Sequence, residues 1–101
     1  MTTNRARQLQ NIDKCHLWHP FTQMKGWLKD DMIIIERAKG HYLYDTAGRR
    51  YLDGISSLWC NIHGHRVPAI DRAIRRQLNK VAHSTMLGLS NVPAIELAKE
   101  L

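Results

Sequence analysis

The sequence has no apolar run long enough to cross a membrane, and it contains few cysteines. Its longest apolar run, residues 32–35, falls far short of the roughly 20 residues that a membrane helix needs. Residues 1–8 are polar and lack the apolar segment of a secretory signal. Two cysteines, Cys15 and Cys60, make no disulfide framework, and reduced thiols are the default in the cytoplasm. We therefore expect a cytoplasmic protein without a membrane partner.

Acidic residues are outnumbered by basic ones, 9 to 15, which gives a formal net charge of +6. A basic nucleic-acid-binding module is one interpretation of this charge, but such proteins cluster their basic residues into a footprint. Here the basic residues are spread along the chain, and the densest group lies on one face of a predicted helix: Arg72, Arg75, Arg76 and Lys80. We favour a solvated face, or a surface that meets an acidic part of a larger protein, and expect no nucleic-acid partner.

Three short segments predict an antiparallel sheet in the first half of the chain. Residues 32–38, 41–45 and 49–53 have the composition of successive strands joined by tight turns. In the second strand, alternation places Tyr42 and Tyr44 on one face and Leu43 on the other. Asp45 and Gly48 suit the first and fourth positions of a type I turn. The predicted fold class is α+β, a three-stranded antiparallel meander followed by helices.

The helical predictions differ in strength along the chain. Residues 1–12 are polar without a sustained periodicity, which predicts a flexible N-terminus, and Asp13 is a candidate cap for a short helical turn over residues 14–18. Residues 68–83 make the best helix. Its apolar residues follow a three-and-four spacing that predicts one buried stripe: Ile70, Ala73, Ile74, Leu78 and Val81.

The final residues predict a helix that still continues at residue 101. Pro93 suits a first helical position, and the apolar residues after it keep a helical spacing with no stop signal. We expect residues 13–101 to be the N-terminal segment of a longer protein, truncated inside this helix. At 101 residues, the chain is at most one domain with a modest core.

Residues 53–65 form the segment with the densest mixture of polar and aromatic groups. Gly54 and Gly64 bracket it and allow sharp turns or close backbone approach. Such a composition is typical of a loop that lines a cleft. Phe21 and Trp59 both lie in irregular, polar surroundings, so a pocket wall is as reasonable a location for them as a core.

A zinc site is a more specific interpretation of this loop, but fewer observations support it. Cys60, His63 and His65 resemble half of such a site, but a closed site needs four ligands, and Cys15 with its neighbouring histidines makes a poor second half. We expect no metal. Instead, the two loop histidines are expected to hydrogen-bond the backbone, and Cys60 to pack as a small apolar residue.

Nucleophilic and Schiff-base chemistry also lack support from the residues. Ser56 and Ser57 have neither a G-x-S-x-G elbow nor an identifiable base, so their hydroxyls are expected to satisfy the loop. A Schiff-base lysine should be desolvated beside the chemistry. The six lysines occur instead on polar faces or in turns: Lys14, Lys25, Lys29, Lys39, Lys80 and Lys99.

Three separated motifs resemble one enzyme family in order and spacing. They are residues 16–24 (HLWHPFTQM), residues 53–59 with 62–65 (DGISSLW and IHGH), and residues 83–88 (HSTMLG). Together they resemble the N-terminal part of the 7,8-diaminopelargonic acid aminotransferases, which are class III aminotransferases of biotin biosynthesis. The resemblance runs from about Asp13 to the end of the chain. Another class III ω-aminotransferase is the alternative within the same class.

The resemblance implies an α/β fold of type I in a pyridoxal-phosphate-dependent homodimer of several hundred residues. Such an enzyme converts 8-amino-7-oxononanoate to 7,8-diaminononanoate, with S-adenosylmethionine or lysine as the amino donor. The cofactor acts as the electron sink. In this family the cofactor lysine and the other cofactor-binding residues come beyond residue 101. No catalytic or cofactor-binding residue is therefore expected in this segment, and the segment alone is expected to be inactive.

The resemblance also implies that Phe21, Leu58 and Trp59 bind substrate. Phe21 occupies a position where relatives often carry tyrosine, and it lacks the phenol hydroxyl. Leu58 and Trp59 fall on a pair that is Trp-Trp in members using S-adenosylmethionine. Leu58 offers neither an indole face to a sulfonium nor an N–H donor. This combination, together with residues 88–93 (GLSNVP), resembles the Bacillus-type branch that uses lysine as donor.

Overall fold

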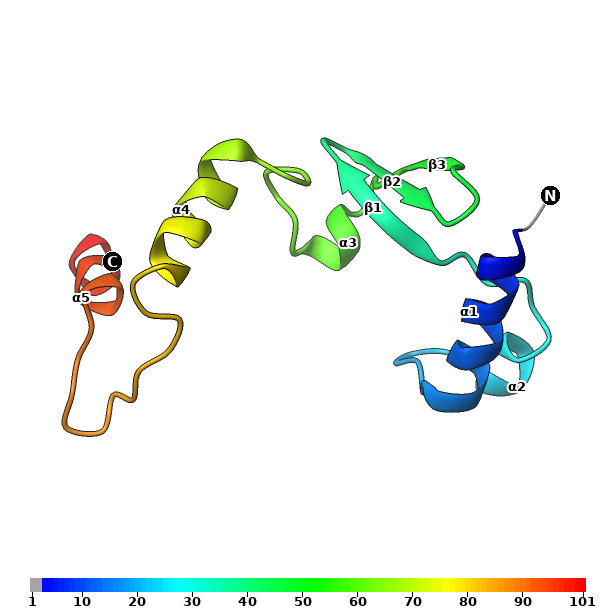
Figure 1. Cartoon of the computed structure of the whole chain (residues 1–101), viewed down its shortest axis with the longest axis horizontal. Helices are drawn as coiled ribbons and strands as arrows, with labels where there is room; N and C mark the ends of the chain where they lie inside the picture. Colours follow the sequence, from blue (N-terminus) through cyan, green and yellow to red (C-terminus); the bar gives the residue numbers. More distant parts are fainter. Residues whose placement is uncertain (1–2) are drawn as a thin grey trace. The chain divides into compact units, whose positions relative to one another are not determined.

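A computed structural model describes residues 3–101, which form two compact units (Figure 1). One unit ends at Val67 and the other begins at Pro68, so the single segment predicted for residues 13–101 contains a boundary. The first unit holds α1 (Asn4–His16), α2 (Met24–Trp27), β1 (Ile35–Lys39), β2 (Tyr42–Asp45), β3 (Arg50–Leu52) and α3 (Ser56–Trp59). The second holds α4 (Pro68–Leu78) and α5 (Val92–Glu100). Within residues 3–101, no helix is long and apolar enough to span a membrane.

The predicted meander is confirmed, with the strands in the order β1-β2-β3 and both pairs antiparallel. Strand β1 begins later than predicted, because the preceding residues bond elsewhere. The Met32 carbonyl accepts a hydrogen bond from Gln10 Nε2 of α1 at 2.9 Å, and the Ile34 carbonyl accepts one from the Thr46 backbone at 3.0 Å. The apolar run at residues 32–35 thus provides the first residue of β1 and also a hydrogen bond to α1.

The predicted faces of β2 are also confirmed. The Arg37 guanidinium lies 3.7 Å from the ring centroid of Tyr44, and the Arg50 guanidinium lies 4.5 Å from that of Tyr42. Both tyrosines therefore share a face covered by cations, an arrangement stabilised by the ring quadrupole. Leu43 is half-buried and pairs in register with Ala38 and Tyr51.

The predicted turn after β2 is built around the Asp45 carboxylate, and Asp45 is only 3% exposed. The Gly48 backbone donates to the Asp45 carbonyl at 2.9 Å, and Gly48 has a φ of 80°. Oδ1 accepts from the backbones of Ala47 and Arg49, while Oδ2 accepts from Arg49 Nε and Tyr51 Oη, all at 2.7–3.0 Å. Burial alone raises the pKa of Asp45, but these hydrogen bonds outweigh it and lower the pKa to about 2.

The flexible N-terminus predicted for residues 1–12 is corrected for residues 4–12, which belong to α1. The Thr3 hydroxyl caps this helix by accepting from the Ala6 backbone at 3.1 Å. Residues 5–10 are almost all strong helix formers, so summed propensity favours the helix although its apolar periodicity is poor. Asp13 lies near the end of α1 and is not a helix cap. Met1 and Thr2 lie outside the described residues.

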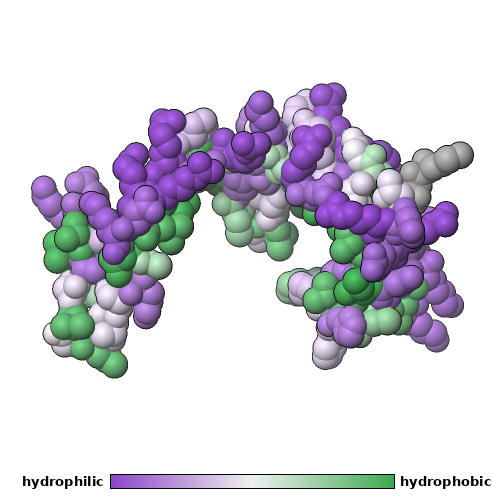
Figure 2. Space-filling view, in the orientation of Figure 1, coloured by the Kyte–Doolittle hydropathy of each residue, from purple (hydrophilic) through white to green (hydrophobic). Residues whose placement is uncertain are grey.

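The second unit leaves its apolar stripe uncovered. Helix α4 ends at Leu78, short of the predicted His83, and the Ile70, Ile74 and Leu78 side chains are exposed. Figure 2 shows apolar residues at the surface of this unit. In residues 3–101 the buried apolar side chains are those of Ala6 and Met32, so the expected modest core is not formed. Uncovered apolar surface of this kind marks a contact surface.

Candidate substrate-binding site

The loop at residues 53–65 is anchored at both ends to the turn between β1 and β2. At its start, the Asp53 backbone donates to the His41 carbonyl at 2.8 Å. At its end, His65 and Gly40 exchange two backbone hydrogen bonds, at 2.7 and 3.0 Å. The predicted irregular loop is therefore held in place by the sheet, as a loop that presents side chains to a ligand should be.

Gly64 is required for the second anchor. Its φ is 83°, and a Cβ placed there would lie 2.9 Å from the Gly40 carbonyl oxygen. We expect Gly64→Ala to lower the free energy of unfolding by about 1–2 kcal/mol from backbone strain, with a further loss from the contact. Urea unfolding of the complete protein measures this. Gly54→Ala is the matched control, because a Cβ there meets no atom within 4 Å. An equal loss in both variants would contradict the role of the anchor.

The turn labelled α3 is left-handed rather than a regular α-helix. Its four residues have positive φ values: 53° at Ser56, 48° at Ser57, 63° at Leu58 and 68° at Trp59. Left-handed backbone costs roughly 1–2 kcal/mol for each non-glycine residue. Four such residues in succession persist only where the surroundings hold them, and strain of this kind clusters at ligand sites.

The Asp53 carboxylate is the side chain that holds this turn. Oδ1 accepts from the Ser57 backbone, and Oδ2 accepts from Ser57 Oγ and His65 Nε2, each at 2.8 Å. The Asp53 side chain is 5% exposed and that of His65 is 17% exposed. The backbone hydrogen bond from Ser57 lowers the pKa of Asp53 most, and the bonds from the Ser57 hydroxyl and from His65 lower it further. Asp53 is therefore a carboxylate at neutral pH.

These contacts decide between the earlier interpretations of the polar residues. The Ser57 hydroxyl satisfies the loop as expected, and it donates to a carboxylate rather than to a histidine. The His65 ring bonds the Asp53 side chain, so the prediction that it bonds the backbone is wrong. Cys60 is exposed and its thiol lies 3.4 Å from the Leu58 carbonyl, so the prediction that it packs inside is also wrong. Over the described range, no three His, Cys, Asp or Glu side chains are grouped to hold a metal.

All three residues predicted to bind substrate have left-handed backbone. The φ angle is 49° at Phe21, 63° at Leu58 and 68° at Trp59. Phe21 is fully exposed, Trp59 is 80% exposed and Leu58 is 57% exposed. Leu58 and Trp59 are adjacent on one turn, whereas no hydrogen bond or ring contact in residues 3–101 joins Phe21 to them. Exposure and strain agree with ligand contact, which remains a prediction for each of the three.

A second polar cluster, absent from the sequence predictions, joins α1 and α2 to the segment between them. Asp13 Oδ1 lies 2.9 Å from His19 Nε2 and accepts from Trp27 Nε1 at 3.2 Å. The His19 and Trp27 ring centroids are 4.5 Å apart. Burial raises the pKa of Asp13, but the bonds from His19 and Trp27 outweigh it and lower the pKa. The sequence carries no spacing signal for this cluster, because only the chain reversal after α1 brings the three residues together.

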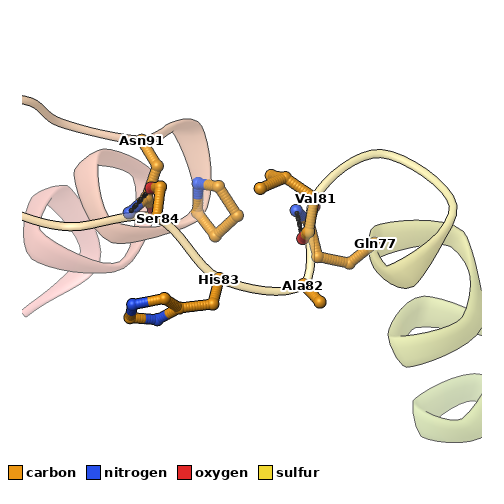
Figure 3. A pocket seen from close by; sticks show the side chains of 7 residues that line it. Gln77, Val81, Ala82, His83, Ser84 and Asn91 are labelled. Atoms are coloured by element: carbon orange, nitrogen blue, oxygen red, sulfur yellow. Dashed lines mark hydrogen bonds between the residues drawn. The ribbon is translucent and has the colours of Figure 1, made fainter.

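Two residues of the motif at residues 83–88, His83 and Ser84, line a small cavity in the second unit (Figure 3). Asn91 Nδ2 lies 3.3 Å from Ser84 Oγ and 3.5 Å from Met86 Sδ, and Asn91 Oδ1 caps α5 by accepting from the Ala94 backbone at 3.0 Å. The cavity has a volume of about 200 Å³ and is lined by Gln77, Val81, Ala82, His83, Ser84, Asn91 and Pro93. Asn91 thus fastens the hydroxyl-rich residues 83–88 to the start of α5.

The surroundings of the six lysines bear on where pyridoxal phosphate would attach. All six lie in the described range; Lys14 is half-buried and the other five are exposed. A Schiff-base lysine needs desolvation. Their exposure agrees with attachment of the cofactor outside this segment, which stays a prediction.

Comparison with known proteins identifies the family. The sequence model of the family Aminotransferase class-III matches residues 25–101 of the chain. The chain belongs to the class III aminotransferase family. A Nitratidesulfovibrio vulgaris protein named adenosylmethionine-8-amino-7-oxononanoate aminotransferase is 58% identical over 98 residues, which cover 97% of this chain and 18% of that protein. The chain thus spans about a fifth of the length of the curated relatives it matches.

Solved structures of this aminotransferase family agree with the fold. The adenosylmethionine-8-amino-7-oxononanoate aminotransferase of Methanocaldococcus jannaschii matches with a TM-score of 0.91 and 49% identity, over 93% of this chain and 22% of that one. An (S)-enantioselective ω-transaminase from Thermomicrobium roseum matches with a TM-score of 0.88 and 35% identity, over 99% and 22%. The expected fold of type I is confirmed, and the adenosylmethionine-8-amino-7-oxononanoate aminotransferase is more similar in sequence to this chain than the ω-transaminase is.

Proposed function

We propose that this segment is the N-terminal part of a pyridoxal-phosphate-dependent aminotransferase that converts 8-amino-7-oxononanoate to 7,8-diaminononanoate in biotin biosynthesis. The 58% identity to a protein named for that ketone is the observation that carries the proposal. The strained and exposed positions of Phe21, Leu58 and Trp59 support it independently.

The three residues would act by binding and orienting the ketone. A nonanoate chain is largely polymethylene, and the flat faces of Phe21 and Trp59 can cover such a chain and exclude water. Leu58 adds an aliphatic contact on the same turn as Trp59. Because Asp53 fixes this turn in advance, the substrate does not have to order it on binding.

The amino donor has two candidates, each supported by a different observation. The names of the relatives favour S-adenosylmethionine. Leu58 favours lysine, because it lacks an aromatic face for the sulfonium and an N–H for the carboxylate. On the residues of this chain, we expect lysine to be the better donor.

The test is a transamination assay of the complete enzyme with 8-amino-7-oxononanoate and each donor in parallel. Turnover with lysine but not with S-adenosylmethionine supports both the reaction and the Leu58 argument. Turnover with S-adenosylmethionine alone keeps the reaction and overturns that argument. If a generic diamine is transaminated and the ketone is not, the enzyme is another class III ω-aminotransferase and the proposal fails.

The remaining features follow from the family. We propose that the complete enzyme binds pyridoxal phosphate through a lysine outside this segment and works as a homodimer. A cytoplasmic location is supported by the exposed, unpaired thiols of Cys15 and Cys60, which suit a reducing compartment. Light scattering and the absorption spectrum of the purified enzyme test the first two points.

A further inference from the structure

The strained turn that carries Leu58 and Trp59 is held through few groups. Within α3, the Trp59 backbone donates to the Ile55 carbonyl at 2.8 Å, but this bond does not fix the turn relative to the sheet. Asp53 supplies that link: its carbonyl accepts from the Ser56 backbone at 3.3 Å, its carboxylate accepts from Ser57, and its own backbone N–H is bonded to His41. The bonds to the carboxylate are the shorter ones, at 2.8 Å, so the orientation of the turn depends chiefly on the orientation of that carboxylate.

His65 fixes that carboxylate from the opposite end of the loop. Its Nε2 donates to Asp53 Oδ2 at 2.8 Å, since an ionised carboxylate can only accept. Its backbone is paired with Gly40 in both directions, so the imidazole is mounted on the sheet. His63, two residues away, is exposed and makes no side-chain hydrogen bond within residues 3–101.

We infer that His65 is a positioning residue for the proposed transamination: through Asp53 it holds the left-handed turn so that Leu58 and Trp59 face the substrate. This inference rests on the proposed function for its kinetic consequence. Within residues 3–101 the His65 side chain hydrogen-bonds to Asp53 and to neither Leu58 nor Trp59, so we expect its effect on turnover to pass through the turn. A displacement of about 1 Å at such a wall is enough to cost about 100-fold in rate.

A double-mutant cycle in the complete enzyme tests the inference. We expect His65→Ala to lower kcat/KM for 8-amino-7-oxononanoate by about 10- to 100-fold. In a Trp59→Ala background the same change should cost several-fold less, because the larger of the two positioned side chains is already gone and only Leu58 remains. His65→Gln should recover most of the loss, because its amide can still donate to Asp53. His63→Ala is the matched control and should leave kcat/KM unchanged.

Three results would overturn the inference. The first is an equal loss from His65→Ala in both backgrounds, which would mean that His65 acts elsewhere. The second is failure of His65→Gln to recover activity. The third is a lower thermal midpoint with unchanged kcat/KM, which is the signature of a merely structural role. If His65→Ala does not fold, Ser57→Ala removes one bond to the same carboxylate, and the same pattern is expected at smaller size.

A readout without substrate separates this inference from the proposed function. In the complete enzyme labelled with 5-fluorotryptophan, we expect His65→Ala to shift or broaden the ¹⁹F resonance of Trp59, assigned with Trp59→Phe, and to leave that of Trp27 in place. If the wild-type enzyme does not turn over the ketone and His65→Ala still shifts the Trp59 resonance, the proposed substrate is refuted and the positioning role is kept. An unmoved Trp59 resonance in an active enzyme refutes the positioning role alone.

Discussion

Trp59→Ala in the complete aminotransferase is expected to lower kcat/KM for 8-amino-7-oxononanoate by about 100-fold. The indole is 80% exposed on a left-handed turn that is fixed by Asp53, so its apolar face is presented in advance of any ligand. Removing it takes away the largest apolar surface of the proposed substrate wall. Steady-state kinetics with the ketone as the varied substrate measures the loss.

Two further variants make the Trp59 result specific. Trp59→Phe keeps an aromatic face and should lose far less activity than Trp59→Ala. Ile62→Ala removes another exposed apolar side chain of the same loop, and we expect its kcat/KM to stay within about twofold of wild type, because Ile62 lacks the left-handed backbone of the turn. Comparable losses for Ile62→Ala and Trp59→Ala would show that the loop as a whole, and not the turn, meets the ketone.

Asp45→Asn is expected to give the largest loss of stability of any single change in the meander. The carboxylate accepts four hydrogen bonds at the turn between β2 and β3, and an amide cannot accept all of them. The thermal midpoint of the complete enzyme should fall by more than it does for Tyr51→Phe, which removes one of the four bonds. An Asp45→Asn variant as stable as Tyr51→Phe would contradict the central role of this carboxylate.

The contribution of Asp45 also has a defined dependence on pH. Its pKa is lowered from 3.8 to about 2 in the folded protein, so folding favours the ionised form. The stabilisation is therefore fully present above the unfolded pKa and is lost as the pH falls through the folded value. We expect the difference in stability between wild type and Asp45→Asn to be constant near neutral pH and to shrink between about pH 4 and pH 2.

Local patterns predicted the sheet because each of its strands and turns is specified by adjacent residues. The alternation in residues 41–45 fixed the two faces of β2, and the Asp45 to Gly48 spacing fixed the turn. The N-terminal helix was missed because its evidence is the summed propensity of residues 5–10 rather than an apolar stripe. Helix α4 is shorter than its pattern, because the stripe continues through Val81 while the backbone turns after Leu78.

The site could be predicted only as far as residue types allow. The resemblance selected Phe21, Leu58 and Trp59, and the composition of residues 53–65 indicated a cleft-lining loop. The left-handed turn itself has no sequence signal, since Ser56 and its neighbours are not the glycines that such backbone favours. The link from His65 to Asp53 spans 12 positions and arises from the pairing of residue 65 with the β1–β2 turn. Contacts of this range follow from tertiary structure and not from spacing.

The most direct test is a crystal structure of the complete enzyme with 8-amino-7-oxononanoate bound. We expect positive φ at residues 56–59, the His65–Asp53 hydrogen bond in place, and the rings of Trp59 and Phe21 within about 4.5 Å of the polymethylene chain of the ketone. A ketone bound by other segments, with Trp59 turned toward the protein interior, would contradict the assignment of this strained turn to the substrate wall.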